Sequence, residues 1–434
     1  MNWTEEQVLA MAPDAASVKA GKAQAKTQKW LSLHRNDNAL WGEIKGSGSK
    51  PYQTAIDTTR LAFKCSCPSR KFPCKHALGL ALLFATASYN FKQNEAPEWL
   101  TQWLNKREQK AEKKPQPKTI DKESQAKRAA AREQKVKAGL EETALWLKDL
   151  IRQGLAQLPE KPHSFWQAPA ARMVDAQAPG IANMIKTLAQ LNYYSQDWYA
   201  DLLKQLSDIY LLTQAYDRLD QFPEDLQSDV KSLIGWSSKK EELKQEAGVT
   251  DNWFVLGQET EKDERLNIKR TWLYGQQYRK FALLIDFYTA GQLPEFTWMP
   301  GGSYKASLVY YPGRQSLRAL LKDQPHYLQL DRPIGSTSLS QLEQAITEAY
   351  TAFPWTRQLP FLLEGVSPQM HNTSFYLVDQ EDKYIPISTS SDKSYLLLAI
   401  SGGQPVSISG IYQHGKLNPL GVWYEEDYIV LNNG

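Results

Sequence analysis

The sequence predicts an α+β protein of several domains: a small N-terminal β-β-α module, a basic linker, a helical middle domain and a β-rich C-terminal domain with one inserted helix. The 434 residues exceed the roughly 100 to 200 of a typical domain. Hydrophobic residues make up 42% of the chain, which is enough to build buried cores. The apolar pattern changes from a helical to a strand period near residue 250.

We assign residues 1–104 to the N-terminal module, with its core at about residues 38–90. A helix is predicted over residues 75–88, because Leu78, Leu82 and Ala85 recur at helical spacing. Cys65 and Cys67 are predicted at the end of a strand, where residues two apart point to the same side, and Pro68 and Pro73 bracket the loop that follows.

The basic linker covers residues 105–138 and has almost no large apolar side chains. It carries 12 basic and 5 acidic residues, whereas residues 1–104 carry 13 and 8. Such a segment cannot bury enough surface to fold alone, although its second half, from about Lys122, favours a helix. The basic charge either marks the first third of the chain as the place where nucleic acid or an acidic protein surface would bind, or belongs to a solvated tether.

The helical domain is predicted over residues 139–250 and the β-rich domain over residues 251–434. One apolar helix face is expected from Leu140, Ala144, Leu147, Ile151, Leu155 and Leu158. After residue 251, short runs rich in Val, Ile, Tyr, Phe and Trp alternate with turn residues, which is typical of strands. A single helix is expected at residues 338–353, with Ser338 as its N-cap.

The segment LAFKCSCPSRKFPCKHALGL contains all three cysteines of the chain and one histidine close by. The residues Cys65, Cys67, Cys74 and His76 give a C-x-C-x6-C-x-H spacing. Three thiolates and one imidazole are the ligands of a closed, tetrahedral zinc site. Because protein groups fill all four positions, no place is left for a reactive water, and we expect one structural Zn²⁺.

The alternative is that three small buried thiols merely line a core. The neighbouring cations Lys64, Arg70, Lys71 and Lys75 argue against it, because a buried strand does not tolerate them. The same four cations should favour thiolate formation, and they are the candidate contacts for nucleic acid or a protein partner.

This segment resembles a SWIM-type zinc finger, with the C-x-C-x(n)-C-x-H pattern intact, over roughly residues 38–90. The resemblance implies a strand, a glycine-containing turn and a second strand before the cysteine pair, and a helix starting near His76. It also implies binding to DNA or protein without catalysis. The whole layout is similar to bacterial SWIM-domain proteins thought to act beside MoxR-type AAA+ ATPases and von Willebrand A-type proteins.

Two functional readings remain, and we favour the first. The chain is a non-enzymatic protein-interaction adaptor, or it binds DNA through the basic module and linker. No catalytic motif is found: GIYQHGKL, at residues 410–417, lacks the hydroxyl that a phosphate-binding loop needs for Mg²⁺. An enzyme site assembled from distant residues would be invisible in one sequence. Free thiols and the lack of a signal peptide or long apolar run predict a soluble, cytoplasmic protein.

Overall fold

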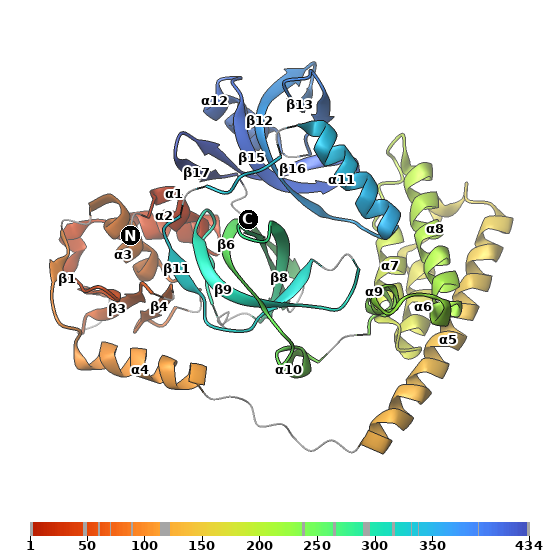
Figure 1. Cartoon of the computed structure of the whole chain (residues 1–434), viewed down its shortest axis with the longest axis horizontal. Coiled ribbons are helices and arrows are strands. Elements are labelled where there is room, and N and C mark those ends of the chain that lie inside the picture. The colour runs from red at the N-terminus through yellow and green to blue at the C-terminus, as the bar shows by residue number, and fades with distance from the viewer. Residues whose placement is uncertain are drawn as a thin grey trace.

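The computed structural model describes residues 3–46, 50–59, 61–69, 71–87, 90–112, 122–236, 239–263, 266–289, 296–314, 317–330, 332–336, 338–388 and 390–431. Figure 1 shows four parts: a finger lobe (residues 3–112) in red and orange, a helical bundle (122–234) in yellow and green, a central barrel (249–328), and a C-terminal sheet with its helices (339–430) in blue. The predicted α+β class is confirmed.

The finger lobe contains four helices and a five-stranded sheet among its described residues. In chain order these are α1 (Glu5–Ala10), α2 (Ala15–Gln24), β1 (Trp30–Arg35), β2 (Ala39–Ile44), β3 (Tyr52–Asp57), β4 (Ala62–Cys65), α3 (Lys75–Ala87), β5 (Lys92–Gln93) and α4 (Glu98–Glu112).

The sheet of the finger lobe has the order β4-β3-β2-β1-β5 and is covered on both faces. Helix α3 packs on one face, where Leu78 and Leu82 are buried as the helical spacing predicts. Helix α4 packs on the other face, with Leu100 buried against Trp41 and Ala55. Helix α4 was not expected, and it extends to Glu112, inside the segment predicted as linker. Residues 113–121 of that segment lie outside the described residues.

The helical bundle contains α5 (Lys122–Gln153), α6 (His163–Asp175), α7 (Pro179–Leu188), α8 (Trp198–Asp217) and α9 (Glu224–Ile234). The short α10 (Lys240–Leu243) follows it and is drawn below the barrel in Figure 1. Helix α5 begins where a helix was expected. It ends at Gln153, before Gly154 with φ +86°, so Leu155 and Leu158 lie beyond the helix and not on its face. Leu150 is buried in place of Ile151, which is exposed, so that part of the predicted apolar face is wrong.

Next along the chain come β6 (Val249–Asp263), β7 (Leu266–Gly275), β8 (Lys280–Tyr288), β9 (Ser303–Tyr310), β10 (Arg318–Leu321) and β11 (His326–Leu328). Strand β10 pairs with β8 on one side and with β9 on the other, which closes β6, β7, β8, β10 and β9 into a barrel. The inward positions include Trp253, Leu273 and Tyr304, all fully buried, so the barrel is filled by side chains.

The C-terminal part contains α11 (Leu339–Ala352), β12 (Leu359–His371), β13 (Ser374–Val378), β14 (Tyr384–Pro386), α12 (Ser391–Ser401), β15 (Val406–Gln413), β16 (Lys416–Tyr424) and β17 (Asp427–Val430). Helix α11 and its Ser338 N-cap are as predicted. Helix α12 is a second helix, so the expectation of a single inserted helix is wrong; its segment lacks a regular apolar stripe, with Tyr395 and Leu396 exposed. Residues 410–417 form the β15–β16 hairpin.

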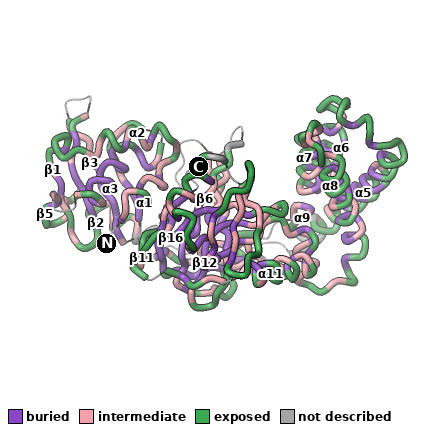
Figure 2. Tube along the Cα trace, turned by 90° about the horizontal axis from the view of Figure 1, so that it is seen from above, coloured by how far each residue is buried: buried purple, intermediate pink, exposed green. Residues whose placement is uncertain are grey.

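Side-chain packing crosses the division predicted at residue 104. One hydrophobic core contains Leu78 and Trp3 of the finger lobe together with Trp298, Met299 and Tyr304 of the barrel. Helix α1 lies at this junction, where Gln7 Nε2 donates to the carbonyl oxygen of Gly301 at 3.5 Å. Figure 2 shows the finger lobe on one side of the central β structure and the helical bundle on the other.

The helical bundle joins the barrel and the segment after α11 through both apolar and polar contacts, and Phe353 and Trp355 lie in the core of the bundle. The Arg314 guanidinium donates to both carboxylate oxygens of Asp225, at 2.9 and 3.2 Å. The indole nitrogen of Trp355 donates to the carbonyl oxygen of Asp208 at 2.9 Å. Among the described residues, no helix has the length and apolar character that crossing a membrane requires.

Candidate metal centre

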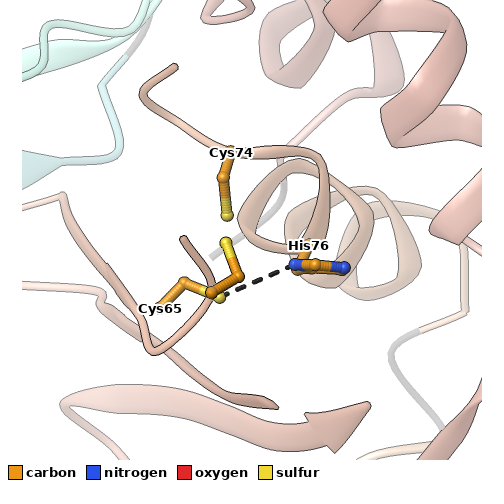
Figure 3. A group of neighbouring side chains, drawn as sticks. Cys65, Cys74 and His76 are labelled. Carbon is orange, nitrogen blue, oxygen red and sulfur yellow. Dashed lines mark hydrogen bonds between the residues drawn. The ribbon is translucent and has the colours of Figure 1, made fainter. Parts of the chain in front are cut away.

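The four predicted ligands come from the end of one strand, the following loop and the start of one helix. Cys65 is the last residue of β4, and Cys67 lies two positions further on in the bend that follows, where its Sγ comes close to the other ligand atoms. Cys74 directly precedes α3, and His76 is the second residue of that helix. Figure 3 shows the labelled side chains converging from β4 and from the first turn of α3.

The ligand atoms lie at distances that suit a single ion. The three Sγ atoms and one imidazole nitrogen are all within 4.8 Å of one another. Cys65 Sγ lies 3.7 Å from His76 Nδ1. Atoms arranged tetrahedrally about 2.3 Å from a zinc ion would be about 3.8 Å apart, which agrees with this geometry. Cys74 and His76 are 4% and 5% exposed, whereas Cys65 and Cys67 are half-buried, so the ion would lie at the edge of the core.

Neighbouring groups orient the ligands. The Thr54 hydroxyl on β3 hydrogen-bonds Cys65 Sγ at 3.2 Å, and the backbone N–H of Ala77 donates to Cys74 Sγ at 3.5 Å. The Tyr52 ring packs against the His76 imidazole at 5.1 Å between centroids. Such outer contacts fix the direction of a ligand and stabilise thiolate charge.

The charges of the three thiols are coupled. A hydrogen bond from the Cys74 thiol lowers the pKa of Cys65 to about 4. The pKa of Cys74 is raised, because its thiol donates that bond and because it is buried. Burial also raises the pKa of Cys67. Three thiolates this close repel one another, and a divalent cation offsets that repulsion.

The donor set, the spacing and the burial therefore fit one zinc ion held by Cys65, Cys67, Cys74 and His76. Bound zinc would supply four fixed links between β4, the loop and α3. With four protein ligands the centre is structural in kind, since no position remains open for a substrate.

The four predicted surface cations lie in different surroundings. Lys64 Nζ donates to the carbonyl oxygen of Trp99 at 3.2 Å and lies 5.2 Å and 5.8 Å from the Trp99 and Trp103 ring centres. Lys71 Nζ lies 2.7 Å from Asp14 Oδ2, and this contact lowers the pKa of Asp14 to about 2. Lys75 is exposed, and Arg70 lies outside the described residues.

The sequence reasoning missed the partners of these cations. Trp99 and Trp103 lie on α4, some 35 residues beyond Lys64, and no local pattern connects them to β4. The sequence could have indicated Asp14 as the N-cap of a helix, because its side chain caps α2 by accepting from the Ser17 N–H at 2.7 Å. Its pairing with Lys71 depends on tertiary packing alone.

Comparison with known protein families gives two matches. Residues 64–84 match the SWIM zinc finger, and residues 131–234 match the SWIM-associated four-helix bundle domain. The first match contains all four ligands, and the second extends from within α5 to the end of α9. Neither the search of curated proteins nor the search of solved structures gives a match.

Proposed function

We propose that this protein is a non-enzymatic adaptor whose zinc-stabilised finger lobe binds a protein partner. A SWIM zinc finger mediates macromolecular interaction, and the metal centre described above has the closed ligand set of a structural site. The large remainder of the chain would then hold the finger in a fixed position relative to a second binding surface.

The surroundings of the predicted contact cations favour a protein partner over DNA. Lys64 packs against α4, and Lys71 is paired with Asp14 although its side chain is 55% exposed. Among the described residues, Lys75 is therefore the predicted contact that is exposed and takes part in no ion pair. Binding of duplex DNA draws most of its affinity from several phosphate contacts. With two of the three described contact positions already engaged, the metal loop itself offers few phosphate contacts and suits a protein surface better.

The resemblance noted above suggests which partners to try first. We propose MoxR-type AAA+ ATPases and von Willebrand A-type proteins as partner classes. We also place this function in the cytoplasm, where a reducing environment keeps the three thiols available for zinc.

DNA binding remains the second candidate, on one observation. Residues 105–138 carry 12 basic and 5 acidic side chains, and Lys135 and Lys137 on α5 are exposed. If this region supplied the affinity, binding would fall steeply with salt and show little preference for sequence.

The test compares proteins that co-purify with the full chain and with two variants. We expect Cys74→Ser, which loses the metal, and Lys75→Glu, which keeps it, both to lose the same partner. Lys416→Glu, on the distant β16, is the control and should retain it. The adaptor proposal is wrong if both finger variants keep every partner. Retardation of duplex DNA by the wild-type chain, lost in the Lys135→Glu/Lys137→Glu variant, would support the second candidate.

A further inference from the structure

The barrel has a strand order that can be compared with known nucleic-acid-binding barrels. Its strands close in the order β6-β7-β8-β10-β9, so the first, second and third strands are followed by the fifth and then the fourth. The β8–β10 pair is parallel and the other pairs are antiparallel. The long first strand, β6, bends at a bulge between Val255 and Gly257. This is the topology of an OB-fold, a barrel that binds oligonucleotides on its second and third strands and neighbouring loops.

Part of that outer face is already covered by the C-terminal sheet. Trp272 and Leu283 of the barrel share a core with Leu420 and Trp423. The approach is close at Gly257, where an added Cβ would lie 2.9 Å from the Leu420 Cβ. A ligand on this barrel is therefore restricted to the part of the surface that remains open.

On the outer side of β8, Phe281 and Ile285 also pack against that core, so the open part is limited to the two ends of β8 and its border with β10. On β8, outward positions alternate with inward ones, and Phe287, which follows Leu283 on the outer side, is 47% exposed. The β7–β8 turn adds the exposed residues Tyr278 and Arg279, followed by Lys280 at the start of the strand. Asp251 holds this turn by accepting from the N–H groups of Gln277 and Tyr278, at 2.9 and 3.0 Å.

Tyr311 and Arg318 border the same strip. Arg318 is the register partner of Leu283 on β8, and the Tyr311 N–H donates to the Arg318 carbonyl oxygen at 2.9 Å. The Arg318 guanidinium lies over the Tyr311 ring, 4.5 Å from its centre. Phe287 lies four residues along β8 from Leu283, or about 13 Å. Two aromatic rings are thus spaced along one ridge, with cations near one end.

The charges on this strip are not all neutralised within the protein. Among the described residues, neither Arg279 nor Lys280 takes part in an ion pair. Two nearby arginines are excluded from the strip because each has a carboxylate: Arg314 pairs with Asp225, and Arg270 Nη1 lies 2.9 Å from Glu261 Oε2. Phe287 is exposed and Tyr311 is half-buried. Accessible rings near available cations are features of surfaces that bind single strands, where bases stack and phosphates follow the positive charge.

We propose that this β8–β10 strip (Tyr278, Arg279, Lys280, Phe287, Tyr311 and Arg318) binds single-stranded nucleic acid. Tyr311 and Phe287 would stack two bases, and Arg279 and Lys280 would contact the phosphates. Stacking accepts every base and shows little preference for sequence. This site is separate from the finger lobe, and it does not depend on the adaptor function proposed above.

The test measures fluorescence anisotropy of labelled dT12 and U12 with the full zinc-loaded chain at several salt concentrations. We expect binding at low salt that weakens as salt rises. Tyr311→Ala and Phe287→Ala should each weaken binding about tenfold, which is within the range for loss of one stacked base. A preference between the two probes would distinguish DNA from RNA as the natural ligand.

A charge variant that folds normally separates a loss of binding from a loss of folding. Arg279 has φ +52°, a conformation that asparagine tolerates well, so Arg279→Asn should fold and lose one phosphate contact. The slope of log affinity against log salt should then fall by about 0.7, the value for one contact with a single strand. Lys305→Gln, an exposed cation elsewhere on the barrel, is the matched control and should leave affinity and slope unchanged. No binding of either probe by the wild type, or equal loss in the Lys305 variant, would overturn the proposal.

Discussion

The helical bundle and the finger lobe differ in what stabilises two of their segments, helix α7 in the bundle and the loop between β4 and α3 in the finger lobe. In the bundle, α7 buries Ile181, Ile185 and Leu188 completely between its neighbours. In the finger lobe, the loop between β4 and α3 is mostly exposed, and Cys74 is one of the few well-buried side chains there. Apolar burial is enough to fix α7, whereas the loop needs the four metal ligands.

The finger lobe, unlike α7 of the bundle, therefore depends on a bound metal ion for its local structure. Zinc binding requires deprotonated ligands and is coupled to folding, so the finger lobe should respond to metal concentration and pH. The bundle has no such dependence. Because the finger lobe shares a core with the barrel, loss of metal should reach the barrel but stop before the bundle.

The largest effect is expected from Cys74→Ser. This variant should lose its zinc and more than about 4 kcal/mol of stability in the finger lobe, because it removes a buried ligand. Calorimetry should show the transition of the finger lobe and barrel at a lower temperature, and the bundle transition unchanged. Ser69→Ala, in the same loop, is the control. A simultaneous loss of the bundle transition would contradict the contrast drawn here.

The reverse experiment alters the bundle. Ile185→Ala removes a fully buried side chain from α7 and should cost about 2–5 kcal/mol. The bundle transition should move to a lower temperature while zinc content stays at the wild-type value. Val174→Ala, at an exposed position of α6, should change neither quantity. Release of zinc by the Ile185 variant would show that the two regions are not separate.

A smaller effect is expected where α2 crosses α3. An added Cβ at Gly79 would lie 2.6 Å from the Gln24 Cβ, so Gly79→Leu must push the two helices apart at a cost of about 1–3 kcal/mol. Helix α3 carries His76, and its displacement should also weaken zinc affinity, measured by competition with a chelator. Zinc affinity equal to that of the wild type would indicate that α2 does not position the site.

The smallest effect concerns the ion pair between Lys71 and Asp14. Both side chains are partly exposed, so Lys71→Met should cost less than about 1 kcal/mol. The pKa of Asp14 is about 2, below the ordinary value near 3.9, so the stabilisation is complete at neutral pH. It is lost as the pH falls through about 2.

Titration of the Asp14 carboxyl carbon by NMR checks this directly. The carboxyl should titrate below its ordinary range in the wild type and closer to that range in Lys71→Met, where only the hydrogen bonds from Ser17 remain. Identical titration curves in the two proteins would show that the ion pair does not form in solution.

Local patterns predicted the metal ligands and several helices well. The spacing of Cys65, Cys67, Cys74 and His76 was sufficient because all four lie within a dozen positions. The helix at residues 75–88 appears as α3, and Ser338 caps α11 through a bond that its own sequence neighbourhood supplies. Each of these features is decided by residues close together in the chain.

Features that depend on distant residues were not predictable in the same way. Closure of the barrel depends on β10, four residues whose partners on β8 and β9 are set by three-dimensional register. The contacts of Lys64 with Trp99 and Trp103 join β4 to a helix that the sequence did not indicate. Helix α12 has no clear apolar stripe, since both Tyr395 and Leu396 are exposed.

X-ray absorption at the zinc edge of the purified full-length chain tests the metal centre most directly. The account predicts one zinc per chain, with three sulfur neighbours at about 2.3 Å and one nitrogen at about 2.0–2.1 Å. Cys74→Ser should lose this signal. A first shell made of oxygen, or protein that is folded without zinc, would contradict it.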